Sequence, residues 1–387
     1  VSEVFLLISE VRIIIPLRAR NYKVNSYSNH LCSYKIIAMG SFSDKLIKWH
    51  KRSGRKNLPW QIDKSPYKVW ISEIMLQQTQ VTTVIPYFER FIKRFPNIST
   101  LAEADQDDVL SLWSGLGYYA RARNIYKTAI ILKSDFNSLL PSSLDQLIDL
   151  PGIGRSTAGA ILSLGFNQKA SILDGNVKRV ITRYRNIEED ITKNKTLNYL
   201  WDIADKLQPE KNFSIYTQSI MDLGAIICKS KTPLCGECPL SEDCLAKKND
   251  SIHLIPFKEK KPKKPSKKVF WLLPYTVSGW VYLRKREDLG LWGGLWTFIE
   301  NHNLDELIIE NNQLLEGIDQ NLLQKHSTIN HSFSHYDLEA DLFLLEFSDC
   351  KANKNWKNIN EIDNIGMPKP IAETLRRIKE NGKISIL

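Results

Sequence analysis

The sequence predicts a mainly helical first domain, a solvated linker and a smaller α+β domain. Across residues 42–225, apolar residues recur at i, i+3 and i+4, the spacing of amphipathic helices. The Lys- and Pro-rich stretch 258–268 cannot bury a core. After it, segments 269–275, 279–284 and 340–347 are rich in Val, Phe, Leu, Trp and Tyr and predict strands. At 387 residues the chain is long enough for two such domains.

These patterns divide the chain into four segments. Residues 1–38 form an N-terminal extension that we expect to be non-native or disordered, because the well-patterned sequence begins at Met39. A helical domain is expected over 39–253, a Lys/Pro-rich linker over 254–269 and the α+β domain over 270–387.

Composition narrows the class of protein. A hydrophobic fraction of 43% and a charged fraction of 25% exclude a wholly disordered or fibrous chain. The net charge of +10 is concentrated in 258–268 and 1–38, so bulk charge is a weak argument for nucleic-acid binding. No apolar run approaches the roughly 18 residues needed to cross a membrane. We therefore expect a cytoplasmic protein with no membrane partner.

Prolines indicate where two helices of the first domain begin. Pro66 is expected to start a helix that turns Val69, Trp70 and Ile74 inward, and Pro86 is expected to start the next. Further amphipathic helices are predicted near 108–114, 121–133, 143–149, 156–164, 177–184 and 197–207.

Four of the six cysteines are clustered near the end of the helical region, with the spacing Cys-x6-Cys-x2-Cys-x5-Cys: Cys228, Cys235, Cys238 and Cys244. One tight cluster in a long chain predicts metal ligation in a reducing compartment, not a disulfide framework. Four thiolates suit either Zn²⁺ or a [4Fe–4S] cluster, and the spacing alone does not choose between them.

A second motif, Leu-Pro-Gly-Ile-Gly at 150–154, predicts a tight turn between two helices. Gly152 and Gly154 place no Cβ in the turn, and the backbone N–H groups that begin the next helix suit a DNA phosphate. A plain packing hairpin would have the same sequence pattern, so this motif leaves both interpretations open.

Two acidic residues are candidates for acid–base chemistry. Glu73 lies within a predicted helix among apolar neighbours, where burial would raise its pKa toward that of a general acid. Asp174 stands just before a helix, where it could be a simple N-cap and also an ionised carboxylate that stabilises a cation. An ordinary surface Glu and a structural cap are the alternatives.

Together these motifs resemble the MutY-type adenine DNA glycosylases of the helix-hairpin-helix (endonuclease III) superfamily. The segments that carry the resemblance are SEIMLQQTQ at 72–80, GLGYYARARN at 115–124, LPGIGRSTAGAILSL at 150–164, LDGNVKR at 173–179, MDLGA at 221–225 and the four cysteines. The match is strong over 42–250. It is looser over 270–387, where the family carries a Nudix-like domain that recognises the lesion.

The resemblance implies a mainly α helix-hairpin-helix glycosylase with one [4Fe–4S] cluster on the four cysteines. It also implies removal of adenine mispaired with 8-oxoguanine, and also with guanine, from double-stranded DNA by base flipping. The implied catalytic residues are Glu73, Asp174, Asn176 and Ser156, and Gln218 would read the adenine. The implied lesion and DNA contacts are Gln78, Thr79, Tyr118, Gly152, Gly154, Ser334 and His335.

One position separates branches of the superfamily. Bifunctional relatives place a Schiff-base lysine two residues after the hairpin's last glycine, and here that residue is Ser156. The resemblance therefore implies a monofunctional hydrolase. The C-terminal region lacks the acidic helix of a working Nudix hydrolase, so we expect no metal-dependent hydrolysis there.

Two other function classes remain open on the sequence. A bifunctional glycosylase/lyase for oxidised pyrimidines shares the hairpin and the cysteines, and a non-catalytic DNA-damage binding protein shares the architecture. We expect a nucleoid-associated monomer of bacterial type that has DNA as its main partner, with other repair proteins possible.

Overall fold

The computed structural model describes residues 39–259, 262–288, 290–316, 323–350 and 353–380. The expected N-terminal extension therefore lies outside the described residues.

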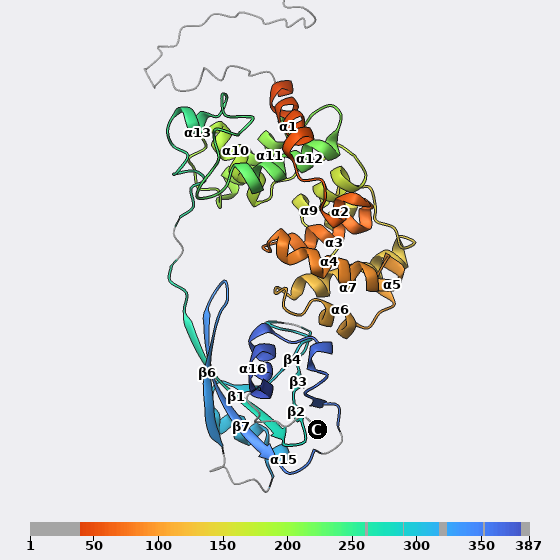
Figure 1. Ribbon diagram of the computed structural model, residues 1–387, viewed down its shortest axis with the longest axis vertical. Coiled ribbons are helices and arrows are strands. Elements are labelled where there is room, and N and C mark those ends of the chain that lie inside the picture. Colours follow the sequence, from red (N-terminus) through yellow and green to blue (C-terminus); the bar gives the residue numbers. More distant parts are fainter. Residues whose placement is uncertain (1–38, 260–261, 289, 317–322, 351–352, 381–387) are drawn as a thin grey trace, which may run out of the picture. The chain divides into compact units, whose positions relative to one another are not determined.

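The helical region consists of two groups of helices (Figure 1). One group contains α2 (Pro59–Ile62), α3 (Pro66–Leu76), α4 (Val81–Arg94), α5 (Ile98–Ala102), α6 (Gln106–Leu112), α7 (Ala120–Asp135), α8 (Leu144–Ile148) and α9 (Arg155–Ala160). The other contains α1 (Met39–Ser53), α10 (Gly175–Arg185), α11 (Asn194–Lys206), α12 (Phe213–Asp222), the π-helical turn η2 (Leu223–Ile227) and α13 (Leu245–Lys248). A π-helical turn that continues α9, η1 (Ile161–Gly165), packs against both α3 and α12 and so joins the two groups.

Burial of large side chains explains why these helices pack as they do. Trp70 on α3, Phe91 on α4 and Trp113 after α6 are fully buried, and the ring of Phe91 meets that of Trp113 edge-on with centroids 6.3 Å apart. In the other group, Phe42 on α1 is buried against Tyr184 on α10, with ring centroids 4.7 Å apart. Aromatic rings thus lie at the centre of both groups, within one continuous hydrophobic core.

Helix α3 begins at Pro66 as expected, with the Ser65 side chain as its cap, but the prediction for Pro86 was wrong. Helix α4 begins at Val81 and Pro86 lies inside it. The proline removes only the hydrogen bond to the carbonyl of Thr82, and Thr82 is exposed, so water can satisfy that oxygen.

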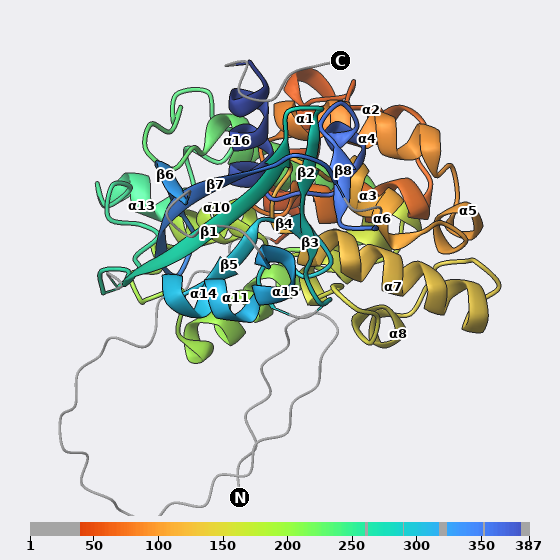
Figure 2. The ribbon, with the colours of Figure 1, turned by 90° about the horizontal axis from the view of Figure 1, so that it is seen from below.

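The C-terminal region is built on a mixed sheet with strand order β6-β7-β1-β2-β8, and β5 pairs with β1 (Figure 2). These strands are β1 (Ser266–Thr276), β2 (Trp280–Tyr282), β5 (Ile299–Asn301), β6 (Gln324–Ser332), β7 (Asp337–Phe347) and β8 (Trp356–Asn358). Strands β3 (Arg284–Lys285) and β4 (Trp296–Thr297) form a separate pair. The accompanying helices are α14 (Leu304–Glu310), α15 (Asn312–Leu315), the 3₁₀ turn η4 (Ile362–Asn364) and α16 (Lys369–Glu380).

The three predicted strand segments are all found, but the first begins earlier than expected. Strand β1 starts at Ser266, within the stretch assigned to the linker, because a parallel ladder with β7 pairs Ser266 with Asp337. Lys268 then lies on the sheet with its ammonium 3.0 Å from the buried carboxylate of Asp341. None of the described helices is both long and apolar enough to cross a membrane.

Candidate active site

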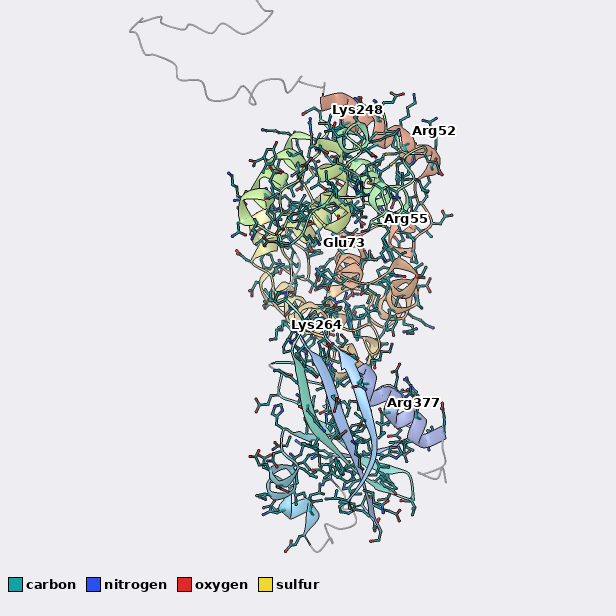
Figure 3. The ribbon with its side chains drawn as sticks, turned by 90° about the vertical axis from the view of Figure 1, so that its left-hand side faces the viewer. Arg52, Arg55, Glu73, Lys248, Lys264 and Arg377 are labelled. Carbon is teal, nitrogen blue, oxygen red and sulfur yellow. The ribbon has the colours of Figure 1, made fainter. Side chains whose placement is uncertain are left out.

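Glu73 lies in the middle of α3, between the buried residues Ser72 and Ile74 (Figure 3). Its side chain is only half-buried, but its carboxyl is largely withdrawn from water. That burial, together with the charge of Asp174, raises the pKa of Glu73 to about 8. Near neutral pH the side chain is therefore mostly a protonated acid, the form that can donate a proton. An ordinary surface Glu would not have this property.

Asp174 is the N-cap of α10, as the sequence indicated. Its carboxylate accepts hydrogen bonds from the Val177 backbone N–H at 2.8 Å and from Asn176 Nδ2 at 3.2 Å. Burial nevertheless raises the pKa of Asp174, because these hydrogen bonds and the charge of Arg179 only partly offset it. Since α3 and α10 belong to different groups of helices, the fold brings the two acids together at the boundary between them.

Ser156 has a defined partner in the segment that leads to Asp174. Its Oγ accepts a hydrogen bond from the Leu173 backbone N–H at 3.0 Å. The hydroxyl thereby anchors the backbone one residue before the acid. The nearby Lys178 has a pKa lowered chiefly by burial, so its amine loses a proton more readily than a surface lysine does.

Gln218 belongs to a buried polar cluster whose centre is Asp222, which the sequence did not single out. Asp222 accepts hydrogen bonds from Gln218 Nε2 at 3.1 Å, His50 Nε2 at 3.2 Å and Arg55 Nη2 at 2.5 Å. Burial would raise the pKa of Asp222, but the bonds from His50 and the charge of Arg55 outweigh it and lower the pKa. Because a carboxylate only accepts, the amide NH₂ of Gln218 must face Asp222, which leaves its amide oxygen as the free acceptor.

Two exposed residues lie on segments next to the helical core. Gln78 follows α3 and Tyr118 precedes α7, and both have left-handed backbone conformations, with φ of 57° and 50°. Thr79 donates its hydroxyl to Gln77 O at 3.3 Å and accepts from Arg121 at 3.2 Å. Arg121 is the second residue that sequence reasoning missed.

The two hairpin glycines differ in what the structure requires of them. Gly152 has φ of 80°, and a Cβ there would come within 2.8 Å of Asn124 on α7. Gly154 has no atom within 4 Å of its Cβ position, so packing within the described residues does not require glycine there. No side chain caps the N-terminus of α9, which leaves its first N–H groups for an outside acceptor.

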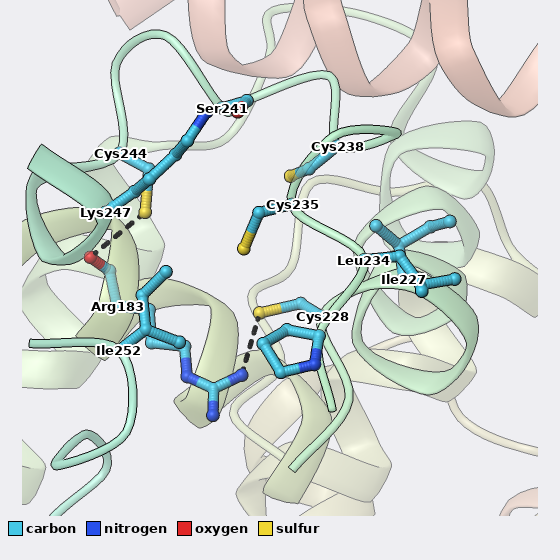
Figure 4. Close-up of a pocket in the computed structure, with 11 residues that line it drawn as sticks. Arg183, Ile227, Cys228, Leu234, Cys235, Cys238, Ser241, Cys244, Lys247 and Ile252 are labelled. Atoms are coloured by element: carbon cyan, nitrogen blue, oxygen red, sulfur yellow. Dashed lines mark hydrogen bonds between the residues drawn. The ribbon is translucent and has the colours of Figure 1, made fainter. Parts of the chain in front are cut away.

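The four clustered cysteines line one small cavity of about 30 Å³ (Figure 4). Buried Arg183 holds this loop from one side: it donates to the carbonyls of Lys229 and Ser230 at 2.6 and 2.8 Å and to Cys228 Sγ at 3.5 Å. Four thiols around one cavity are a donor set that suits either Zn²⁺ or a [4Fe–4S] cluster.

Arg179 connects this loop to the acids. Its guanidinium donates to Cys228 O at 2.7 Å, to Gly224 O at 2.6 Å and to Asn176 Oδ1 at 2.8 Å. Asn176 in turn donates to Asp174. The cysteine loop and the acid at the start of α10 thus share one hydrogen-bonded network.

Ser334 and His335 form the exposed tip of the turn between β6 and β7, with Ser334 Oγ 3.4 Å from His335 Nδ1. Below them, Phe333 packs against Trp292 and Tyr336, with ring centroids 5.2 and 4.8 Å apart. Lys264 donates to the Phe333 carbonyl at 2.6 Å, so the end of the predicted linker also supports this turn. The exposed side chains of Ser334 and His335 can therefore contact an outside partner, on a turn that Phe333 and Lys264 hold in place.

Comparison with known families assigns three parts of the chain. Residues 71–206 match the HhH-GPD superfamily of base excision DNA repair proteins, and residues 228–244 match the iron–sulfur binding domain of endonuclease III. Residues 270–377 match the NUDIX domain. The four cysteines are therefore the ligands expected for a [4Fe–4S] cluster, which agrees with their arrangement around one cavity.

Full-length relatives and a solved structure extend these matches. The chain is 43% identical to the adenine DNA glycosylase of Buchnera aphidicola subsp. Baizongia pistaciae, over 88% of this chain and 97% of that protein. It is 30% identical to the adenine DNA glycosylase of Mus musculus, over 84% of this chain and 74% of the mouse protein. The structure of a thermostable thymine-DNA glycosylase superposes with a TM-score of 0.50 at 25% identity, covering 55% of this chain and 97% of that one. The chain belongs to the adenine DNA glycosylase family.

Proposed function

We propose that this protein hydrolyses the N-glycosidic bond of adenine mispaired with 8-oxoguanine, or with guanine, in double-stranded DNA, without cutting the strand. The observation that carries the proposal is the raised pKa of Glu73 beside Asp174. Cleaving this bond requires a proton donor for the departing base and a negative charge near the sugar. The two acids supply both.

Glu73 is the general acid. Adenine leaves poorly as an anion, so it must gain a proton while the bond breaks, and protonated Glu73 donates it at N7. The resulting carboxylate then activates the attacking water. Such acid–base help is typically worth about 10²–10⁴-fold in rate.

Asp174 offsets the positive charge that develops on the sugar. It does so electrostatically or through a transient covalent bond. Asn176, which donates to Asp174 at 3.2 Å, orients that carboxylate or the water. One well-placed electrostatic partner is commonly worth about 3–4 kcal/mol. Ser156 contributes by holding the Leu173 backbone next to Asp174.

The adenine must leave the helical stack to reach these acids. Gln78 and Tyr118 enter the duplex around the mispair, and Thr79 helps to hold 8-oxoguanine. Gln218 reads the flipped base. Its amide oxygen, left free by the bond to Asp222, matches the exocyclic amino group of adenine.

The DNA backbone and the opposite base are held elsewhere. The open space beside Gly154 and the uncapped start of α9 support a phosphate contact there, with Gly152 shaping the turn. The loop of the cluster offers Lys229 and Lys231 to further phosphates, which gives the cluster a structural role. The exposed tip Ser334–His335 contacts 8-oxoguanine.

The chemistry is monofunctional on this proposal. Ser156 replaces the lysine that would form a Schiff base, and its hydroxyl is occupied by the Leu173 N–H. Water is then the nucleophile that replaces the base, and the sugar–phosphate chain stays intact.

The decisive assay uses anaerobically purified protein and a duplex with one adenine opposite 8-oxoguanine. Strand breaks are expected only after alkali, which cleaves at the abasic site that base release creates. Gel electrophoresis of treated and untreated samples gives the result. Breaks without alkali would instead favour a lyase acting through Lys178. Binding with no breaks in either sample would favour a non-catalytic damage-binding protein.

Replacing the acid separates chemistry from binding. Glu73→Gln should lower single-turnover excision by at least about 10²–10⁴-fold, since an amide cannot donate the proton. Lesion-duplex affinity measured by gel shift should stay close to that of the wild type. Glu89→Gln, at an exposed position on α4, is the matched control and should leave both unchanged. An equal loss of affinity and turnover in Glu73→Gln would mean that Glu73 is structural.

The pH profile should report the raised pKa of Glu73. Only the protonated acid donates, so single-turnover excision should be full below about pH 8 and fall about tenfold per unit above it. At low pH the rate should fall again as Asp174, whose pKa is also raised, loses its charge. A basic limb that begins near the ordinary glutamate pKa of about 4.3 contradicts this assignment.

Removing one cluster ligand should affect folding and DNA binding together. Cys235→Ser should lose iron, unfold at a lower temperature and bind the lesion duplex on the order of tenfold or more weakly, because the loop loses its scaffold. Iron analysis, thermal unfolding and gel shift measure the three effects. Cys350→Ser, outside the cysteine cluster, is the control. An iron-free Cys235→Ser protein with full stability and affinity would rule out the structural role.

A further inference from the structure

The two residues proposed to enter the duplex have backbones that need support. Gln78 and Tyr118 both have positive φ, which side chains other than glycine rarely adopt. Tyr118 is 50% exposed, so its own side chain adds little packing to hold it. Such conformations persist only where the surroundings impose them. Those surroundings converge on one buried side chain, that of Arg121 on α7.

One end of the Arg121 guanidinium holds the segment that carries Gln78. Arg121 Nη1 donates to the carbonyls of Ile74 at 3.0 Å, Met75 at 2.7 Å and Gln77 at 2.7 Å. The last carbonyls of a helix have no donor within the helix and lie at its negative end. Ile74 O also accepts from the Gln77 backbone N–H at 3.3 Å, so the buried cation adds to that bond, binds the carbonyls of Met75 and Gln77 as well, and fixes the backbone immediately before Gln78.

The other end holds the segment that carries Tyr118. Arg121 Nη2 donates to the carbonyls of Leu116 at 3.3 Å and Gly117 at 3.0 Å, and to Thr79 Oγ1 at 3.2 Å. The Tyr118 ring centroid lies 5.4 Å from the guanidinium carbon, within the range of a cation–π contact. One side chain thus links the segments on both sides of the proposed wedge.

We propose that Arg121 is a positioning residue that holds Gln78 and Tyr118 as a preformed wedge before DNA arrives. The inference rests on the proposed function, in which these two residues enter the duplex. None of the six hydrogen bonds of Arg121 goes to Glu73, Asp174 or Gln218. Arg121 therefore acts on extrusion of the adenine and not on cleavage of the bond.

Arginine is specifically required by this geometry. A guanidinium is a planar fork that donates in two directions at once, whereas a lysine ammonium is a single point at the end of a flexible chain. Arg121→Lys keeps the buried charge and much of the packing, but an ammonium has three N–H donors at one point and cannot replace all six hydrogen bonds. This substitution therefore weakens the link while keeping the cation.

The test compares two substrates in single-turnover excision by the full-length holoprotein. In one, the adenine is paired opposite 8-oxoguanine in a duplex. In the other, it lies in an unpaired bubble and needs little extrusion. Arg121→Lys should slow excision from the duplex on the order of tenfold or more and leave the bubble rate within about twofold. Arg94→Lys, at an exposed ion pair with Asp108, is the matched control and should change neither rate.

A double-mutant cycle then asks whether Arg121 acts through the wedge. In a Gln78→Ala/Tyr118→Ala background, Arg121→Lys should have no further effect on the duplex rate. Additive losses would overturn the inference, as would equal slowing on duplex and bubble, or no slowing at all. Wild-type protein that releases no adenine from either substrate would overturn the proposed function itself, and this inference with it.

A milder variant covers the case in which Arg121→Lys does not fold. Trp113 Nε1 donates to the same Gly117 carbonyl at 3.0 Å, and its ring centroid lies 5.3 Å from the Arg121 guanidinium carbon. Trp113→Phe removes the hydrogen bond and keeps an aromatic ring beside the cation. It should slow the duplex reaction, by less than Arg121→Lys does, and spare the bubble. Equal slowing of both substrates by Trp113→Phe would likewise overturn the inference.

Discussion

The active site depends on the desolvation of two carboxyl groups placed next to each other. In water Glu73 would be ionised at neutral pH and useless as an acid. Burial in the middle of α3, together with the charge of Asp174, raises its pKa to about 8. Asp174 is buried too, but its N-cap hydrogen bonds partly offset that burial. Two similar side chains can therefore take opposite roles, and the difference arises from their hydrogen bonds and not from their chemistry. Because one acid belongs to each group of helices, the effect of Asp174 on the pKa of Glu73 depends on how the two groups pack.

Buried charged side chains in the helical region are each matched by several partners. Arg121 is bound by carbonyls at the end of α3 and Arg183 by those of the cysteine loop, whereas Asp222 is bound by the side chains of Arg55, His50 and Gln218. Each stabilises an irregular or functional segment that lacks the internal hydrogen bonds of a helix or strand. Leaving a buried charge unpaired would cost much free energy, so each charged side chain and its partners hold one another in place.

Much of the fold and of the candidate site could be predicted from the sequence, wherever a pattern of neighbouring residues indicates the structure. The helix carrying Glu73, the cap at Asp174 and the cysteine cluster all follow from short-range patterns, and the strands of the α+β region follow from its composition. The electrostatic coupling of Glu73 to Asp174 could not be predicted from spacing, because the two residues lie on distant parts of the chain. Arg121 and Asp222 were missed because a charged residue in a helix normally faces water, and only tertiary partners reverse that. A signal existed for Asp222, which interrupts the apolar run Ser-Ile-Met-Asp-Leu-Gly-Ala-Ile-Ile.

The early start of β1 was missed because Lys and Pro residues are typical of a linker, and only pairing with β7 makes this stretch a strand. The roles assigned to Gln78, Thr79, Tyr118, Ser334 and His335 stay predictions.

With the proposed substrate, the choice of which adenine to remove cannot be made in the catalytic pocket. Adenine opposite 8-oxoguanine is an undamaged base, so an acceptor on Gln218 cannot distinguish it from every other adenine in the DNA. Selectivity must come from the cost of extrusion, which is lower at a mispair, and from recognition of the opposite base. A wedge that is already formed favours this arrangement, because ordering it during the encounter would weaken binding to all sites alike. In the proposed mechanism, a preformed wedge of Gln78 and Tyr118 would test how readily each base pair opens. Glu73 and Asp174 would then act on any adenine that reaches them.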